Sequence, residues 1–181
     1  MVWLNAIFLR FYCLSIAGAV LAAAGAVLLF LLLRRQFDGR RGWTAGVACL
    51  LLVWLAAVLW VTVWSRGDGS AHDTILIPFY SYYTVLTGGN PELLRSNFMN
   101  VLLFLPAGLL LGSLLPRKWP LRVRLLWVGV LLAALSAGIE LFQHIRCLGR
   151  AEIDDVFHNT LGALLGGWAA AAGRTHTIPE S

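Results

Sequence analysis

The chain has 181 residues, of which 59% are hydrophobic and only 13% are charged, and its mean hydropathy is +0.77. These residues offer too little polar surface to cover a water-soluble globule of this size, so the composition excludes a soluble domain. The net charge of +5 resides in short basic clusters between long apolar runs, which is typical of membrane loops and argues against a nucleic-acid partner.

Five apolar runs are each about long enough to cross a bilayer, which takes about 20 helical residues. They cover residues 11–33, 43–64, 98–115, 125–144 and 156–173. The runs are rich in Leu and Ala and lack the alternation of a membrane barrel, so strands are not expected. We therefore predict an all-α integral membrane bundle of about five transmembrane helices. Residues 1–181 would form a single membrane domain in a multi-pass protein of the cell membrane.

The loops predict how this bundle is oriented. Two of them are strongly basic, and the positive-inside rule places both in the cytoplasm. Their basic residues are Arg34, Arg35, Arg40 and Arg41 in the first loop, and Arg117, Lys118, Arg122 and Arg124 in the third. The second and fourth loops carry more acids and face outward. With five crossings, the N-terminus lies outside and the C-terminus is cytoplasmic.

The second loop contains an apolar and aromatic stretch at residues 75–83. Pro78 interrupts this stretch, and it is too short to span a membrane. We expect it either to lie along the outer interface or to fold back over the bundle.

Polar residues occur on one face of each of the last three predicted helices. An ionisable side chain inside lipid is by default a functional hypothesis, and Glu140 lies roughly 6 to 9 Å below the outer end of its helix. The spacing of three or four residues on each helix predicts that these faces meet in an outward-opening pocket. Its predicted residues are Asn100, Glu140, Gln143, Asp155 and Asn159, with Arg150 and Asp154 at its rim.

Several of these residues also have purely structural interpretations. Asp154 or Asp155 would be favourable as an N-cap of the last helix. Asn100 and Asn159 are candidates for interhelical hydrogen bonds, and the glycine pairs at 108/112 and 162/166 are typical of close helix packing. These alternatives stay open at the level of the sequence.

A metal site is a weaker alternative. A carboxylate and a histidine stand four residues apart twice, at Glu140 with His144 and at Asp154 with His158. This spacing matches no established ligand signature, so we assign no metal and no cofactor and keep a divalent ion as the alternative.

The same positions carry short motifs in a characteristic order. They are IPF at 77–79, NFMNVLLFLP at 97–106, ELFQ at 140–143, Arg150, and DDVFHNTLG at 154–162. In this order and spacing, region 77–167 resembles the VanZ-like family of small membrane proteins. Where that family tends to have Pro-Phe-Gly, this chain has Pro106-Ala107-Gly108. The resemblance implies a cell-envelope protein, because the namesake of the family is a determinant of resistance to the lipoglycopeptide teicoplanin.

Together these features predict a membrane protein that binds or modifies a lipid-linked envelope component, such as a cell-wall precursor, or a lipoglycopeptide. Arg150 would pair with an anionic group of the ligand, or with Asp154 when the site is empty. One alternative is a membrane hydrolase or transferase with Glu140 and Asp155 as its catalytic acid/base pair. A small transporter or flippase is the other. The oligomeric state is not predicted.

Overall fold

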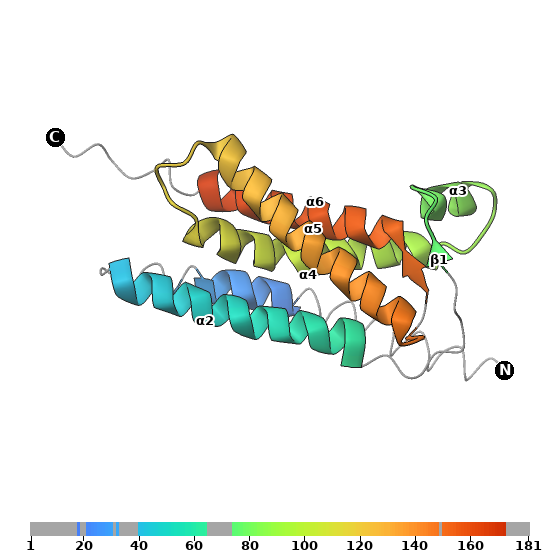
Figure 1. Cartoon of the computed structure of the whole chain (residues 1–181), viewed down its shortest axis with the longest axis horizontal. Coiled ribbons are helices and arrows are strands. Elements are labelled where there is room, and N and C mark those ends of the chain that lie inside the picture. The colour runs from blue at the N-terminus through green and yellow to red at the C-terminus, as the bar shows by residue number, and fades with distance from the viewer. Residues whose placement is uncertain are drawn as a thin grey trace.

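The computed structural model describes residues 18, 21–30, 32, 40–64, 74–148 and 150–172. Helices dominate this part of the chain, and its two strands have two residues each (Figure 1). The elements are α2 (Arg40–Leu59), η1 (Trp60–Trp64), β1 (Thr74–Ile75), α3 (Tyr80–Leu86), α4 (Glu92–Leu114), α5 (Leu121–Ile145), β2 (Ala151–Glu152) and α6 (Ile153–Ala172).

Among the described residues, three helical segments are long and apolar enough to cross a membrane, namely Gly42–Trp64, Glu92–Leu114 and Leu121–Ile145. The prediction of a helical membrane protein is thereby confirmed, whereas the count of about five spans and the orientation stay predictions. In the first predicted span, 11–33, the described residues include a shorter apolar helix, Leu21–Phe30. The rest of that span and both chain ends lie outside the described residues.

The starts of α4 and α5 differ most from the predicted runs. α4 begins at Glu92 rather than near residue 98, and α5 begins at Leu121 rather than near 125. Each helix directly follows a proline, Pro91 or Pro120, whose φ lies near −60°. A proline at a helix start loses no intrahelical hydrogen bond, so the helix begins there and takes in the polar residues that follow.

α4 lies at the centre of the bundle and contacts α2, α3, α5 and α6. It runs parallel to α6, and the two helices touch through glycines. A Cβ built at Gly162 would lie 2.1 Å from the Val101 carbonyl oxygen, and one at Gly108 would lie 2.0 Å from that of Ala163. The backbones therefore approach as closely as side-chain-free positions allow, as the glycine spacing predicted.

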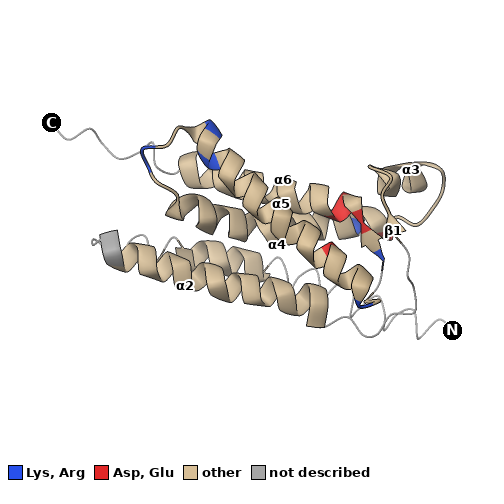
Figure 2. Ribbon diagram, viewed as in Figure 1, with Lys and Arg blue, Asp and Glu red and all other residues tan. Residues whose placement is uncertain are grey.

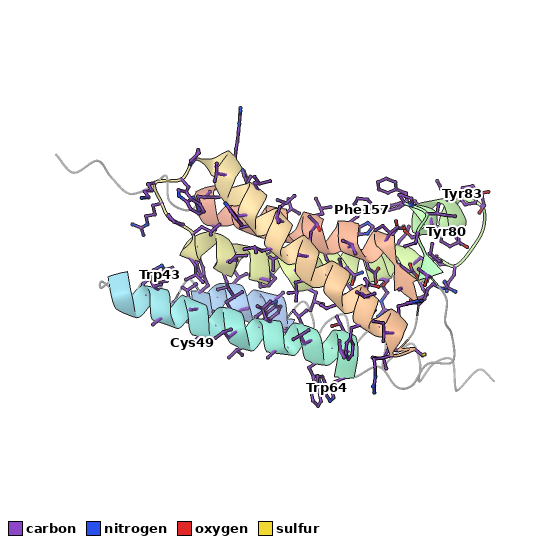
Figure 3. The ribbon with its side chains drawn as sticks, in the orientation of Figure 1. Trp43, Cys49, Trp64, Tyr80, Tyr83 and Phe157 are labelled. Atoms are coloured by element: carbon purple, nitrogen blue, oxygen red, sulfur yellow. The ribbon has the colours of Figure 1, made fainter. Side chains whose placement is uncertain are left out.

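α2 runs along the other side of α4, with Trp43 and Trp64 near its two ends (Figure 3). The Trp54 indole nitrogen donates a 2.9 Å hydrogen bond to the Leu103 carbonyl of α4. This bond lies one turn before Pro106, which has no N–H with which to continue the helical ladder. A side chain of α2 thus fastens the two helices where the α4 ladder is weakened.

We call residues 74–86 the strap. The strap consists of the short strand β1, a turn and α3, and it folds back over one end of the bundle. β1 pairs in parallel with β2, with Thr74 opposite Ala151 and Ile75 opposite Glu152. We expected residues 75–83 either to lie along the outer interface or to fold back over the bundle, and the structure shows the second placement. We call this end of the bundle the α3 end; it lies on the right in Figure 1.

Candidate ligand pocket at the α3 end

Acidic side chains gather at the α3 end, and the basic loop between α4 and α5 lies at the other (Figure 2). The acids that the structure describes are Glu92, Glu140, Glu152, Asp154 and Asp155. Of these, Glu140, Asp154 and Asp155 are buried. A buried carboxylate needs hydrogen-bond donors, so the partners of each one indicate what it does.

Asp154 holds the strap. Its Oδ1 accepts from the Phe79 amide at 2.6 Å, and its Oδ2 accepts from the Ser81 amide at 3.0 Å and the Ser81 hydroxyl at 2.5 Å. The side chain is only 2% exposed, and the strap occupies both of its carboxylate oxygens. The carboxylate reaches the strap rather than the N–H groups of its own helix, because the strap turn presents three donors toward it.

Further polar bonds tie the strap to α4 and α6. The Asn97 amide of α4 donates to the Ser81 hydroxyl at 2.8 Å. The His158 Nδ1 lies 2.5 Å from the Asp154 backbone carbonyl, which can only accept, so this nitrogen carries the proton. In the neutral ring, Nε2 then accepts from the Tyr82 hydroxyl at 2.8 Å. Both ring nitrogens are therefore engaged, which disfavours His158 as a metal ligand with Asp154.

Glu140 lies apart from this network, beside a pocket of about 240 Å³. Its carboxylate is mostly buried, and Oε2 accepts from the Glu152 backbone N–H at 3.1 Å. The other polar lining residues are Thr74, His144 and Glu152, and Thr74 Oγ1 lies 2.9 Å from His144 Nδ1. The remaining walls are apolar. They consist of Leu76, Ala137, Leu141, Ala151, Ile153 and Val156.

The other predicted pocket residues do not line this pocket. Gln143 is buried and donates to the Thr62 carbonyl of η1 at 2.7 Å, so it holds α2. Asn159 donates to the Ser136 hydroxyl of α5 at 2.8 Å, which is the interhelical hydrogen bond left open by the sequence. Asp155 is buried in the first turn of α6.

Arg150 and Asn100 complete the predicted set. Arg150 is exposed, with a guanidinium nitrogen 3.8 Å from Glu152 Oε1, whereas the carboxylate of Asp154 is bound by the strap. Asn100 is half-buried on α4. Within the described part of the chain, its Nδ2 and the Oδ1 of Asn159 are enclosed without a hydrogen-bond partner. Among the described residues, the predicted set thus contributes to the strap network, to the Asn159–Ser136 bond and to the Glu140 pocket, and a common ligand site for the whole set stays a prediction.

The sequence interpretation missed Thr74 and Glu152 as lining residues and considered His144 only as a metal ligand. The spacing of His144 does carry a signal, because residues four apart share one face of a helix. Thr74 and Glu152 reach the pocket through the β1–β2 pair, which has no clear signature in two-residue strands. Among the residues that the structure describes, no three His, Cys, Asp or Glu side chains are grouped to hold a metal ion.

Comparison with known proteins found no match among curated proteins and none among solved structures. A family model described as VanZ/LLP1 matches residues 44–173. The match includes all the motifs at 77–162 and extends over α2, which the motifs had left out. In the structure, the hydrogen bonds of Trp54 and Gln143 join α2 and η1 to the segments that carry these motifs. The chain therefore belongs to the VanZ/LLP1 family, in agreement with its motifs.

Proposed function

We propose that this membrane protein binds an envelope amphiphile, either a lipid-linked cell-wall component or a lipoglycopeptide, in the pocket beside Glu140. The pocket itself carries the proposal. A mostly buried carboxylate on a membrane-length helix meets a cavity of about 240 Å³ whose other walls are largely apolar. A carboxylate in this setting is more often functional than structural, because its burial opposes folding.

The basic loop at the opposite end supports an outward pocket. Arg117 and Lys118 lie between α4 and α5, Arg122 lies in the first turn of α5, and the positive-inside rule makes all three cytoplasmic. The α3 end then faces the outside of the cell membrane, where lipid-linked envelope components and lipoglycopeptides are met. A role in teicoplanin susceptibility follows from this placement together with the family.

Binding is favoured over the two alternatives. The catalytic alternative needs a second acid/base group in the pocket, and Asp155 is not among the described residues that line it. A transport route would need space between the helices, whereas α4 and α6 meet backbone to backbone at Gly108, Gly162 and Gly166. The pocket therefore supports recognition at one end of the bundle.

Filling the pocket tests this function. Ala137 lines the pocket, and Ala134 is exposed one turn earlier on α5 and does not line it. Cells that make the Ala137→Trp variant are expected to lose any change in teicoplanin susceptibility that the unaltered chain confers. Cells with Ala134→Trp should keep it. Membrane abundance is measured by immunoblotting.

The same pair of variants tests binding directly. Purified protein in nanodiscs is titrated with teicoplanin and, separately, with a polyprenyl-linked cell-wall precursor. At least one of them is expected to bind the Ala134→Trp protein and not the Ala137→Trp protein. Equal binding of both compounds to the two variants would refute a function of this pocket.

A further inference from the structure

We infer that the Glu140 pocket selects amphiphiles whose head group carries a protonated amine. This inference rests on the proposed function, that the pocket binds an amphiphile, and adds the chemistry of the head group. It reverses the expectation that Arg150 receives an anionic group of the ligand.

The polar lining is acidic. Glu140 and Glu152 contribute carboxylates, and no Lys or Arg occurs among the described lining residues. Two carboxylates in a partly apolar cavity attract a cation and oppose a phosphate or carboxylate, because the low local dielectric strengthens both effects. The bond from the Glu152 amide holds the Glu140 carboxylate at the wall of the pocket.

The Arg150 guanidinium does not occupy the position that we infer for the ammonium group of the ligand. It lies outside the lining, and its side chain is 43% exposed. Its nitrogen stands 3.8 Å from Glu152 Oε1, which is longer than the roughly 2.7–2.9 Å of a charge-assisted hydrogen bond. Arg150 therefore approaches Glu152 from outside the pocket lining.

The size and walls of the pocket indicate the rest of the ligand. A volume of about 240 Å³ is below the roughly 300–1,000 Å³ of pockets that enclose a whole drug-sized molecule, so it suits a head group. Leu76 and Leu141 line it and are 71% and 59% exposed. Exposed apolar residues at the edge of the pocket, at the end of a membrane-length helix, provide a surface along which an acyl chain can continue into the bilayer.

The test compares two lysophospholipids with the same acyl chain. Lysophosphatidylethanolamine carries an ammonium group, and lysophosphatidylglycerol carries hydroxyls in its place. Binding to the purified full-length chain is measured by native mass spectrometry. The ethanolamine lipid is expected to bind about tenfold more tightly, as one hydrogen bond to a charged group provides. Glu140→Gln should reduce this preference to near unity, because it weakens binding of the ethanolamine lipid and relieves the repulsion of the anionic glycerol lipid.

Glu92→Gln is the matched control. It removes one negative charge at the same end of the bundle but outside the pocket lining, where Glu92 pairs with Arg95. This variant should keep the tenfold preference, and an equal loss in both variants would overturn the inference by showing a general charge effect. If Glu140→Gln does not fold, Glu152→Gln makes the same comparison.

Different results would refute the proposed function of the pocket and its inferred preference for an amine. If both lipids bind equally and Ala137→Trp weakens both, the pocket binds amphiphiles and the amine preference is wrong. If Ala137→Trp changes neither affinity, the site is not this pocket, and the proposed function and the inference are both refuted. Teicoplanin as a competitor of the bound ethanolamine lipid shows whether the antibiotic occupies the same pocket.

Discussion

The two halves of α6 pack against the same neighbour in different ways. The C-terminal half meets α4 through glycine backbone, at Gly162 and Gly166. The N-terminal half carries buried Asp154, His158 and Asn159, and their partners lie on the strap and on α5 as well. A glycine contact depends on only two helices, whereas the polar half depends on segments far apart in the chain. The packing of the C-terminal half therefore depends on fewer segments of the chain than that of the N-terminal half.

The largest effect is expected where the backbones touch. A Cβ at Gly166 would lie 2.0 Å from the Leu105 carbonyl oxygen, which cannot move without the helix. Gly166→Ala should therefore separate α4 from α6 and cost about 3 kcal/mol or more. Gly138→Ala is the control, because nothing lies within 4 Å of its Cβ. Unfolding in detergent measures both, and equal stability would mean that the close contact contributes nothing.

The next largest effect is expected at Asp154. Asp154→Ala removes the acceptor of two amides and one hydroxyl, a loss on the order of 2–3 kcal/mol that falls on the strap. Amide hydrogen exchange at residues 77–86 should accelerate, while exchange in the glycine half of α6 stays slow. Glu92→Ala, which breaks only an exposed ion pair, should leave the strap protected. Uniform acceleration along α6 would show that the two halves are not independent.

A smaller loss is expected at the boundary between the halves. Ser136→Ala leaves the buried Asn159 Nδ2 without its acceptor and should cost about 1–2 kcal/mol. Ser113→Ala is the control, because this serine is also buried and its hydroxyl donates to the Leu109 carbonyl of its own helix. Its unfolding midpoint should stay close to that of the unaltered chain. If both serine variants lose the same stability, the bond between α5 and α6 contributes no more to the free energy of unfolding than a bond within one helix.

The smallest effect concerns the strap alone. Tyr82→Phe removes the hydroxyl that reaches His158 and should cost about 1 kcal/mol, since the site is partly exposed. Tyr83→Phe alters the neighbouring tyrosine, which is 67% exposed, and should be neutral. Hydrogen exchange of α3 distinguishes them, and indistinguishable α3 exchange in the two variants would exclude a role for the His158 ring in holding the strap.

The membrane class, the α2, α4 and α5 spans and the glycine contacts were predictable from the sequence. The reason is that they depend on composition and spacing within one helix. The strap network was not, because Asp154 binds backbone amides 73 and 75 residues away, and a backbone N–H has no signature in the sequence.

Gln143 shows a second limit of spacing arguments. One residue of an α-helix turns by about 100°, so Gln143 and His144 lie on opposite sides of the direction in which Glu140 points. The structure uses both sides, with His144 lining the pocket and Gln143 bound to the Thr62 carbonyl. Polar residues spaced three or four apart on one helix can therefore contact different neighbouring segments.

The bond between Gln143 and Thr62 also determines how short a functional fragment can be. A truncated chain that begins at the strap would retain every motif of 77–162, yet it would lack the acceptor for a buried amide. It would also lose Val58 from the core cluster around Phe104 and Val128. The minimal autonomous unit for expression or for domain fusion therefore begins before α2.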